Sequence, residues 1–349
     1  MRIVHAVRSD GFAGVERHVA LLARAQAAAG HQVAVVGGRP DAMGDALAGA
    51  PVRQRSASTT LEVARALRRL SSGSDVVHVH MTAAEVGATI SGVGHGPGRP
   101  VVVTTRHFAG RRGHGLLGPL VSAVARRDVT AQIAISRFVA EHVDGESVVV
   151  HPGVARREPL APAADRDRVV LLAQRLEPEK RTDLGLRAFA ASRLAADGWR
   201  LDVVGDGSLR AETERLATSL GLDGAVRFRG HRADVHLLMA HAAILLAPCP
   251  VEGLGLSVLE AMAAGLPVVA ADAGGHRETL AGLDPAALYA ALDPSAAAAS
   301  LRALAGATGR REAYGLAAAR AQRARFTPDA QYHATDAVYR AALAGRDDA

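Results

Sequence analysis

The chain has 349 residues, of which 49% are hydrophobic, 22% charged and 3% aromatic, and its formal net charge is +6. This length predicts two domains of ordinary size, and no apolar run approaches the roughly 20 residues that cross a bilayer. The single cysteine, Cys249, excludes an internal disulfide and a cysteine-ligated zinc cluster.

Strand and helix patterns alternate along the first half of the chain. Strands are expected at residues 2–7, 32–36, 76–80, 101–105, 132–135 and 147–150. Helices are expected at residues 15–29, 59–70, 115–127 and 137–142. Gly30 directly follows the first helix and suits its termination. Such alternation predicts a parallel sheet with helices packed on it.

Residues 155–167 lack periodicity and are rich in proline, alanine and charge, which is typical of a linker. A second series of strands is expected at residues 168–173, 200–204, 226–228, 243–247 and 267–270. Helices are expected at residues 183–195, 209–220, 235–241 and 256–264. A helical tail covers 294–344 and breaks at 326–328, where Pro328 can begin the final helix.

The pattern therefore predicts two doubly wound α/β domains, one over residues 1–154 and one over residues 168–328, joined by the linker. Ligands of such sheets bind at the carboxyl ends of the strands. The N-terminus runs directly into a strand-like segment without the features of a signal peptide, so we expect a cytoplasmic protein.

Residues 252–269 read EGLGLSVLEAMAAGLPVV and carry the strongest functional signal. Glu252 lies in a loop interrupted by glycines, and Glu260 lies one turn into the following helix. Glycine lets a ligand approach the backbone closely, and a helix start offers unpaired N–H groups and a positive dipole end. Both carboxylates could then bind hydroxyl groups of a ligand. A loop, a helix and a surface glutamate are the simpler alternative.

The whole string resembles the E-x7-E segment of the retaining glycosyltransferases of family 4. These proteins have the GT-B fold, in which two Rossmann-like domains face a cleft and the last helix, here 329–349, returns to the first domain. The resemblance implies that Glu260 binds the ribose hydroxyls of a nucleoside-diphosphate sugar and that Glu252 binds the transferred sugar. Backbone groups that would bind sugar or phosphate oxygens belong to Gly253, Leu254, Gly255 and Leu256.

Arg175 and Lys180, the only lysine, bracket the loop after strand 168–173. Two cations beside a helix start could neutralise a diphosphate, or they could be ordinary solvated charges. The stretch is similar to the family's G-R-L-x-x-x-K segment, with Gln174 in place of the glycine. This resemblance implies that the two cations hold the donor's diphosphate and assist its departure. The D-x-D of 165–167 falls in the expected linker, so we predict neither a divalent metal nor another cofactor.

Weaker similarities add further donor-binding candidates. Gly205 and Gly207 form a turn after strand 200–204 that resembles the family's G-x-G segment, although it could be a simple turn. Arg229 and Gly230 follow the next strand, where the family's backbone meets the nucleotide base. Gly14 lies in a stretch similar to the glycine-rich entry loop of the family, without its adjacent glycine pair.

His107 follows strand 101–105, where the family commonly has a histidine beside the transferred sugar. It could bind a sugar hydroxyl or stabilise developing charge. His78 and His80 alternate on one strand and therefore point the same way, and buried structural histidines explain them equally well. The segment 151–154 occupies the place of the family's P-N-G-V, lacks the asparagine, and receives no predicted function.

Positive charge is concentrated in the first half, with a net of +7 for residues 1–164 and −1 for residues 165–349. A basic cluster is expected from Arg106, His107, Arg111, Arg112, His114, Arg126 and Arg127. It could contact an anionic membrane surface or an anionic acceptor, or consist of scattered solvated side chains. The low aromatic content and the lack of a recognition module argue against nucleic-acid binding.

The sequence thus predicts a retaining, metal-independent glycosyltransferase that uses a nucleoside-diphosphate sugar. Its predicted catalytic residues are His107, Arg175, Lys180 and Glu252. The acceptor is not identified; a small natural product, a glycan and a lipid all fit, and the protein could work at the inner face of the membrane. Two alternatives stay open: a sugar-nucleotide epimerase of the same architecture, and a non-catalytic partner subunit that binds the nucleotide sugar without turnover.

Overall fold

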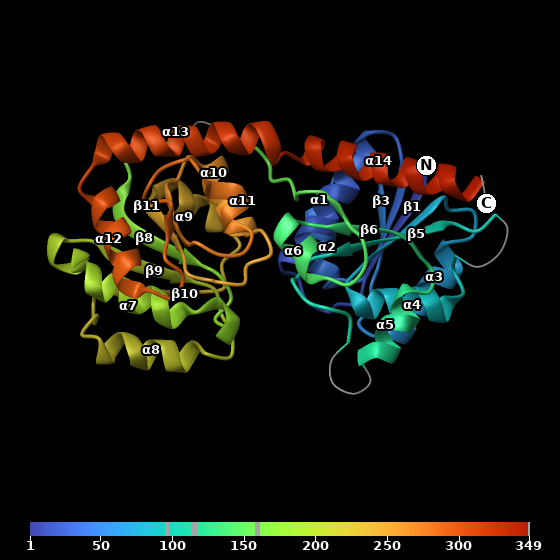
Figure 1. Cartoon of the computed structure of the whole chain (residues 1–349), viewed down its shortest axis with the longest axis horizontal. Helices are drawn as coiled ribbons and strands as arrows, with labels where there is room; N and C mark the ends of the chain where they lie inside the picture. Colours follow the sequence, from blue (N-terminus) through green and yellow to red (C-terminus); the bar gives the residue numbers. More distant parts are fainter. Residues whose placement is uncertain (95–97, 114–117, 158–160, 348–349) are drawn as a thin grey trace. The chain divides into compact units, whose positions relative to one another are not determined.

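Two units make up the chain in the computed structural model, which describes residues 1–94, 98–113, 118–157 and 161–347. Unit 1 comprises Met1–Gly153 and Pro328–Ala349, and unit 2 comprises Val154–Thr327 (Figure 1). Residues 114–117, which include His114 and the start of the helix expected at 115–127, lie outside the described residues.

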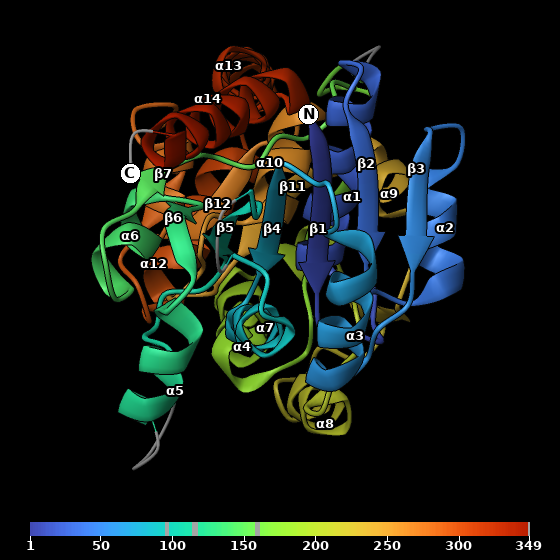
Figure 2. The same ribbon diagram turned by 90° about the vertical axis from the view of Figure 1, so that its right-hand side faces the viewer.

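Unit 1 contains a seven-stranded parallel sheet in the order β3-β2-β1-β4-β5-β6-β7 (Figure 2). Its strands are β1 (Arg2–Val7), β2 (Gln32–Val36), β3 (Val52–Arg55), β4 (Val76–His80), β5 (Val101–Arg106), β6 (Val129–Ala134) and β7 (Val148–Val149). Its helices are α1 (Gly14–Ala28), α2 (Pro40–Leu47), α3 (Thr60–Leu70), α4 (Thr82–Ser91), α5 (Gly118–Arg126), α6 (Arg137–His142) and α14 (Pro328–Asp347).

The central strands of this sheet are buried throughout because helices cover both of its faces. Every residue of β4 and β5 is buried, which matches the continuous apolar runs typical of parallel sheets. On one face, Val63 and Leu67 of α3 pack with residues of α4 and the sheet. On the other face, α1 and α2 pack against β2, and Tyr339 of α14 packs against β1, β4 and β5.

In unit 2 the sequence analysis missed the helix His276–Leu280 and the strand Leu288–Tyr289, and in unit 1 it missed α2, α4 and the strand β3. The strand reads Val-Arg-Gln-Arg, and only Val52 and Gln54 are half-buried. As the edge strand it pairs only with β2, so it needs little apolar surface and gives no apolar run.

Unit 2 contains a six-stranded parallel sheet in the order β10-β9-β8-β11-β12-β13. Its strands are β8 (Asp167–Ala173), β9 (Arg200–Val204), β10 (Val226–Gly230), β11 (Ala242–Ala247), β12 (Val268–Ala271) and β13 (Leu288–Tyr289). Its helices are α7 (Thr182–Ser192), α8 (Arg210–Ser219), α9 (Val235–His241), α10 (Leu256–Ala263), α11 (His276–Leu280), α12 (Pro294–Ala305) and α13 (Thr308–Arg325). Two Rossmann-like parallel sheets, as predicted, thus lie one in each unit.

The segment expected to be a linker is partly built into unit 2. Arg166 is buried, and its guanidinium donates to the carbonyl oxygens of Met239, Ala242 and Ala264 at 2.8, 2.9 and 2.7 Å. Asp167 already begins β8. The linker prediction was therefore too long, because the carbonyl partners of Arg166 are distant in sequence and leave no local pattern. Residues 158–160 of this segment lie outside the described part.

The basic cluster expected between residues 106 and 127 is also partly internal. Arg112 donates to both carboxylate oxygens of Glu85 at 2.7 Å and to Asp144 at 2.9 Å. Arg106 pairs with Asp144 at 3.2 Å, and both arginines are buried. Both charges are therefore paired in the interior, and the expected surface cluster loses these two arginines. No helix within the described ranges is both long enough and apolar enough to traverse a lipid bilayer.

Candidate functional site

The loop that leads from β8 to α7 ends at Lys180 and is held by the side chain of Gln174. The Gln174 amide donates to the Lys180 carbonyl oxygen at 2.9 Å and to Thr182 Oγ1 at 3.0 Å. Residues Pro178–Lys180 form a 3-10 turn, and Arg181 adopts a positive φ of 51°. Gln174 thus fixes the backbone of Lys180, a role that the sequence comparison with a glycine did not indicate.

Lys180 contacts Glu252, the first glutamate of the E-x7-E segment. Lys180 Nζ donates to Glu252 Oε2 at 2.6 Å, and the two side chains are only 15% and 21% exposed. Burial opposes the charged lysine, but the Glu252 carboxylate raises the pKa of Lys180 above its ordinary value. Burial opposes the charged glutamate, but Lys180 lowers the pKa of Glu252. The two groups therefore form a charged pair within hydrogen-bond distance.

Backbone contacts hold the Glu252 loop against the turn after β12. Gly275 N donates to Glu252 O at 2.9 Å. A Cβ atom on Gly274 would lie 2.5 Å from Glu252 O, and one on Gly275 would lie 2.3 Å from Gly253 O. Side chains at these two positions would therefore displace the Glu252 loop. The sequence analysis missed both residues, although a glycine pair shortly after a predicted strand was the available signal.

Two further buried groups surround the Lys180–Glu252 pair. His276 Nδ1 lies 3.1 Å from Ala271 O, and burial lowers the pKa of this histidine. Cys249 Sγ donates to Glu179 O at 3.3 Å, and burial raises the pKa of this thiol to about 11. Both groups are therefore neutral at pH 7 and add no charge beside the Lys180–Glu252 pair.

The remaining donor-site candidates of unit 2 lie on neighbouring loops. Gly255 precedes α10 with a φ of 89°, and Gly253 and Leu254 are buried beside it. Glu260 is half-buried on α10, whose first residue is Leu256. The predicted residues of the segment are thus gathered at the start of this helix.

The G-x-G turn packs directly on the Lys180 loop. A Cβ atom on Gly205 would lie 1.9 Å from Gln174 O, and one on Gly207 would lie 2.5 Å from Leu176 O. Leu176 N also donates to Asp206 O at 2.9 Å. These glycines therefore let two loops at the carboxyl edge of the sheet pack together.

The arginines of the site differ from Lys180 in their surroundings. Arg175 pairs with Glu179 at 2.7 Å, and the two side chains are 53% and 43% exposed, an arrangement that contributes little to stability. Arg229 donates to the buried Asp202 at 2.9 and 3.2 Å, and Gly230 follows with a φ of 65°. Arg175 thus lies on the same loop as Lys180 without taking part in the Glu252 pair.

In unit 1, the predicted residues lie at the carboxyl ends of β1 and β5. Gly14 is the first residue of α1, whose N-terminus is capped by a hydrogen bond from Ala13 N to Glu16 at 2.8 Å. His107 directly follows β5 and keeps 7% of its surface exposed. Its Nε2 atom lies 3.1 Å from His80 Nδ1, so the histidine is part of a cluster.

That cluster consists of five buried histidines: His5, His18, His78, His80 and His107. Among the described residues, two trios bring ring nitrogens within 4.8 Å of one another, and both contain His80. Imidazole is a ligand for zinc and copper. However, both ring nitrogens of His80 are engaged in hydrogen bonds with His5 and His107, so the residue that the two trios share has no nitrogen free for a metal.

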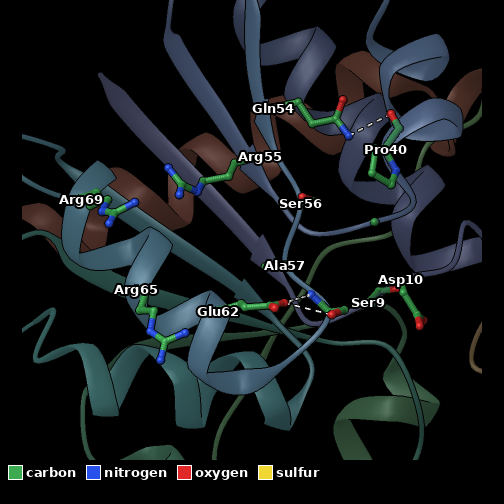
Figure 3. A pocket seen from close by; sticks show the side chains of 12 residues that line it. Ser9, Asp10, Pro40, Gln54, Arg55, Ser56, Ala57, Glu62, Arg65 and Arg69 are labelled. Carbon is green, nitrogen blue, oxygen red and sulfur yellow. Dashed lines mark hydrogen bonds between the residues drawn. The ribbon is translucent and has the colours of Figure 1, made fainter.

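A polar hollow of about 710 Å³ opens at the carboxyl ends of β1, β2 and β3 (Figure 3). Arg55 of β3 and Arg65 and Arg69 of α3 line it, and none of these three side chains has a hydrogen bond or ion pair with another described residue. Glu62, the acid beside them, accepts hydrogen bonds at 2.7, 2.9 and 3.1 Å from the residues that cap α3. The lining thus holds three arginines and two carboxylates, Asp10 and Glu62, and its net charge is positive.

Two family models match the chain. The one described as Glycosyltransferase Family 4 matches residues 12–157, and the one described as Glycosyl transferases group 1 matches residues 158–320. Together they extend over most of both units.

Curated relatives align with part of the chain. A GDP-mannose-dependent alpha-(1-6)-phosphatidylinositol monomannoside mannosyltransferase of Mycobacterium tuberculosis is 31% identical over 246 residues, which cover 61% of this chain and 63% of that protein. The 2-deoxystreptamine glucosyltransferase of Streptomyces kanamyceticus is 28% identical over 197 residues, which cover 55% of this chain and 51% of that protein. The chain thus spans less than two thirds of the length of these relatives.

The fold is that of a solved structure, Anabaena HepE in complex with UDP. The TM-score is 0.77 at 21% identity, and the alignment covers 97% of this chain and 99% of that one. The two parallel-sheet units therefore form the GT-B fold, which confirms the predicted fold class.

Proposed function

Since the chain belongs to glycosyltransferase family 4, as its E-x7-E segment predicts, we propose that it transfers a sugar from a nucleoside-diphosphate sugar to a hydroxyl-bearing acceptor. One observation supports this above the others. Lys180 and Glu252 come from loops 72 residues apart, yet they form a half-buried pair at 2.6 Å beside the start of α10. A buried charge pair contributes little to stability on balance, so its placement favours a role in binding.

The proposed roles follow from charge. Lys180 and the positive end of α10 would bind the diphosphate of the donor, with Arg175 as a second cation. Glu252 would accept hydrogen bonds from hydroxyls of the transferred sugar, and Glu260 from those of the ribose. For a donor to bind, Lys180 has to exchange part of its contact with Glu252 for the phosphate oxygens.

In the reaction, the bond between the anomeric carbon and the diphosphate oxygen breaks, and the diphosphate leaves with the electron pair. The acceptor hydroxyl oxygen bonds to the same carbon and passes its proton to the departing diphosphate oxygen. Lys180 would stabilise the charge that develops on the leaving diphosphate. His107 would bind a hydroxyl of the sugar, and Gly14, Gly205, Gly207, Arg229 and Gly230 would line the donor's path.

We propose that this chemistry is metal-independent and retaining. Lys180, Arg175 and the helix dipole supply the positive charge that a divalent ion supplies to other phosphate-binding sites. Retention is implied by the family resemblance, and attack on the face from which the diphosphate departs accounts for it.

The hollow of unit 1 is the proposed place for the acceptor. Arg55, Arg65 and Arg69 suit an acceptor with a phosphate or carboxylate group. The exposed Arg111 and Arg126 of the same unit would add contact with an anionic lipid surface, as expected for a cytoplasmic enzyme that uses a lipid acceptor.

The test uses the purified protein with UDP-glucose and GDP-mannose, and a panel of acceptors with and without an anionic group. We expect sugar transfer that persists in EDTA and gives a product with the donor's anomeric configuration by proton NMR. Lys180→Ala and Glu260→Ala should each lower kcat/KM at least 100-fold, whereas Arg187→Ala, on the exposed face of α7, should not change it.

Near-normal turnover of Lys180→Ala would refute the assigned roles, and a strict requirement for divalent ions would refute metal independence. Release of free or epimerised sugar without transfer to any acceptor would point to the alternatives of an epimerase or a non-catalytic binding subunit.

A further inference from the structure

Three buried histidines of unit 1 form a hydrogen-bonded chain that ends at His107. His5 of β1 and His80 of β4 lie on adjacent strands, and His107 follows β5, the next strand along. His5 Nδ1 lies 3.1 Å from His80 Nε2, and His80 Nδ1 lies 3.1 Å from His107 Nε2. At its inner end, His5 Nε2 lies 2.6 Å from the amide oxygen of Gln26 on α1.

Gln26 sets the direction of this chain. Its amide oxygen can only accept a hydrogen bond, so the proton of His5 lies on Nε2 and His5 Nδ1 accepts. His80 must then donate from Nε2 and accept at Nδ1, and His107 must donate from Nε2. Each neutral imidazole has one donor and one acceptor, so the remaining nitrogen of His107, Nδ1, carries a lone pair.

The other amide atom of Gln26 is also satisfied in this orientation. Gln26 Nε2 donates to the hydroxyl of Tyr339 on α14 at 3.2 Å. That hydroxyl lies 2.6 Å from His78 Nδ1, and His78 Nε2 lies 2.7 Å from Thr105 Oγ1. A hydroxyl that accepts from Gln26 and donates to His78 satisfies every group of this branch.

Burial keeps the rings of the chain neutral. It lowers the pKa of His5 to about 4 and holds those of His80 and His107 well below their ordinary value. The positive charge of His18 and of the other ring neighbours would add to this effect. At neutral pH each ring therefore has the single proton on which the assignment depends.

We propose that Gln26, His5 and His80 are positioning residues that hold His107 as its Nε2–H tautomer, so that Nδ1 accepts a hydrogen bond from a hydroxyl group of the bound sugar. His107 Nδ1 has no hydrogen-bond partner among the described residues, and the ring lies at the carboxyl edge of the sheet. The nature of the ligand rests on the proposed function; the tautomer rests on the hydrogen bonds alone.

The direct test is the long-range 1H–15N correlation spectrum of the protein labelled with 15N-histidine, at pH 7.5, with His107 assigned by its absence in His107→Gln. We expect a protonated Nε2 and an unprotonated Nδ1. A spectrum with the proton on Nδ1 would overturn the proposal, because it requires the reversed chain with a flipped Gln26 amide. One transition-metal ion per chain that is lost in His80→Leu would also overturn it, because the rings would then be ligands.

Matched variants separate positioning from packing. Gln26→Leu removes the acceptor of His5, whereas Gln26→Glu keeps one, because a carboxylate also accepts. Thr105→Val is the control: it removes the acceptor of His78 in the same core and leaves the His5–His80–His107 chain intact. We expect mixed tautomers of His107 in Gln26→Leu and His80→Leu, and the native tautomer in Gln26→Glu and Thr105→Val.

Kinetics give the second readout. For UDP-glucose or GDP-mannose, whichever the wild type uses, Gln26→Leu should lower kcat/KM about tenfold, the effect of one lost hydrogen bond. Gln26→Glu and Thr105→Val should stay within threefold. Equal losses in all three variants would mean a purely structural role and overturn the proposal. If the wild type transfers no sugar but shows the expected spectrum, the proposed function fails while the tautomer assignment stands.

Discussion

Acidification to pH 5 should destabilise unit 1 much more than unit 2. Burial lowers the pKa of His5 to about 4 and that of His18 to about 3, and it lowers those of His78, His80 and His107 as well. In the unfolded chain these histidines have a pKa of about 6.5. Below pH 6.5 the unfolded state therefore binds more protons than the folded state, and the free energy of unfolding falls as the pH falls.

The size of the effect follows from the pKa values. Each pH unit below 6.5 lowers the free energy of unfolding by about 1.4 kcal/mol per histidine, until the pH reaches the pKa of that histidine in the folded state. At pH 5 this amounts to about 2 kcal/mol for His5 and about 2 kcal/mol for His18, with further loss from the other three rings. A total of at least about 4 kcal/mol is a large part of the 5–15 kcal/mol that stabilises a typical domain. Paired carboxylates such as the half-buried Asp144 titrate only at lower pH.

The assay is urea denaturation at pH 7.5 and pH 5, with a separate probe for each unit. The only tryptophan, Trp199, is buried in unit 2, so its fluorescence follows that unit. Amide hydrogen exchange of β1, β4 and β5 follows unit 1. In the described part of unit 2, His276 is the histidine with a lowered pKa, so the fluorescence midpoint should change less. His18→Phe should remove about 2 kcal/mol of the pH dependence. Equal unit 1 midpoints at the two pH values would refute the reasoning.

Three further predictions concern the two sites. Glu252→Gln frees Lys180 from its carboxylate partner, so UDP should bind several-fold more tightly in calorimetry while the transfer rate falls; weaker UDP binding would contradict this role of the pair. Gly274→Ala should lower the free energy of unfolding in urea by at least about 2 kcal/mol, because its Cβ would lie 2.5 Å from a backbone oxygen. Gly282 has a positive φ of 78° in open space, so Gly282→Ala should lower it by about 1 kcal/mol. Similar losses in the two variants would exclude the close contact as the cause. Arg65→Ala should raise the KM for an anionic acceptor about tenfold and leave that for a neutral acceptor unchanged, and an equal effect on both acceptors would remove the proposed anion contact.

The fold class and the donor-site segment could be predicted because both depend on local patterns. The buried parallel strands are apolar runs, and the segment from Glu252 to Glu260 is continuous in sequence. The contacts that shape the site are not continuous. Gln174 closes the Lys180 loop through the backbone of Lys180 and the hydroxyl of Thr182. The lack of space for a Cβ atom at Gly274 comes from Glu252, on a loop that is distant in sequence.

Charge was the least predictable property. The run of arginines around residue 110 reads as a basic surface, yet Arg112 is 2% exposed and bound by Glu85 and Asp144. Likewise, the alternation of His78 and His80 predicts only that both point the same way. Their partners His5, Gln26 and Tyr339 come from β1, α1 and the final helix, and no local pattern connects them.

Tyr339 makes the completion of unit 1 depend on a segment that is synthesised after all of unit 2. This side chain lies in the same core as Ile3 and Val103, more than 200 residues earlier in the chain. While the ribosome still holds residues 328–347, the nascent first unit lacks the helix that covers this part of its core and the hydroxyl that accepts from the Gln26 amide. Unit 2, whose residues are contiguous, is then free to fold before the unit that precedes it, and the histidine chain takes its final order only after the last helix has emerged.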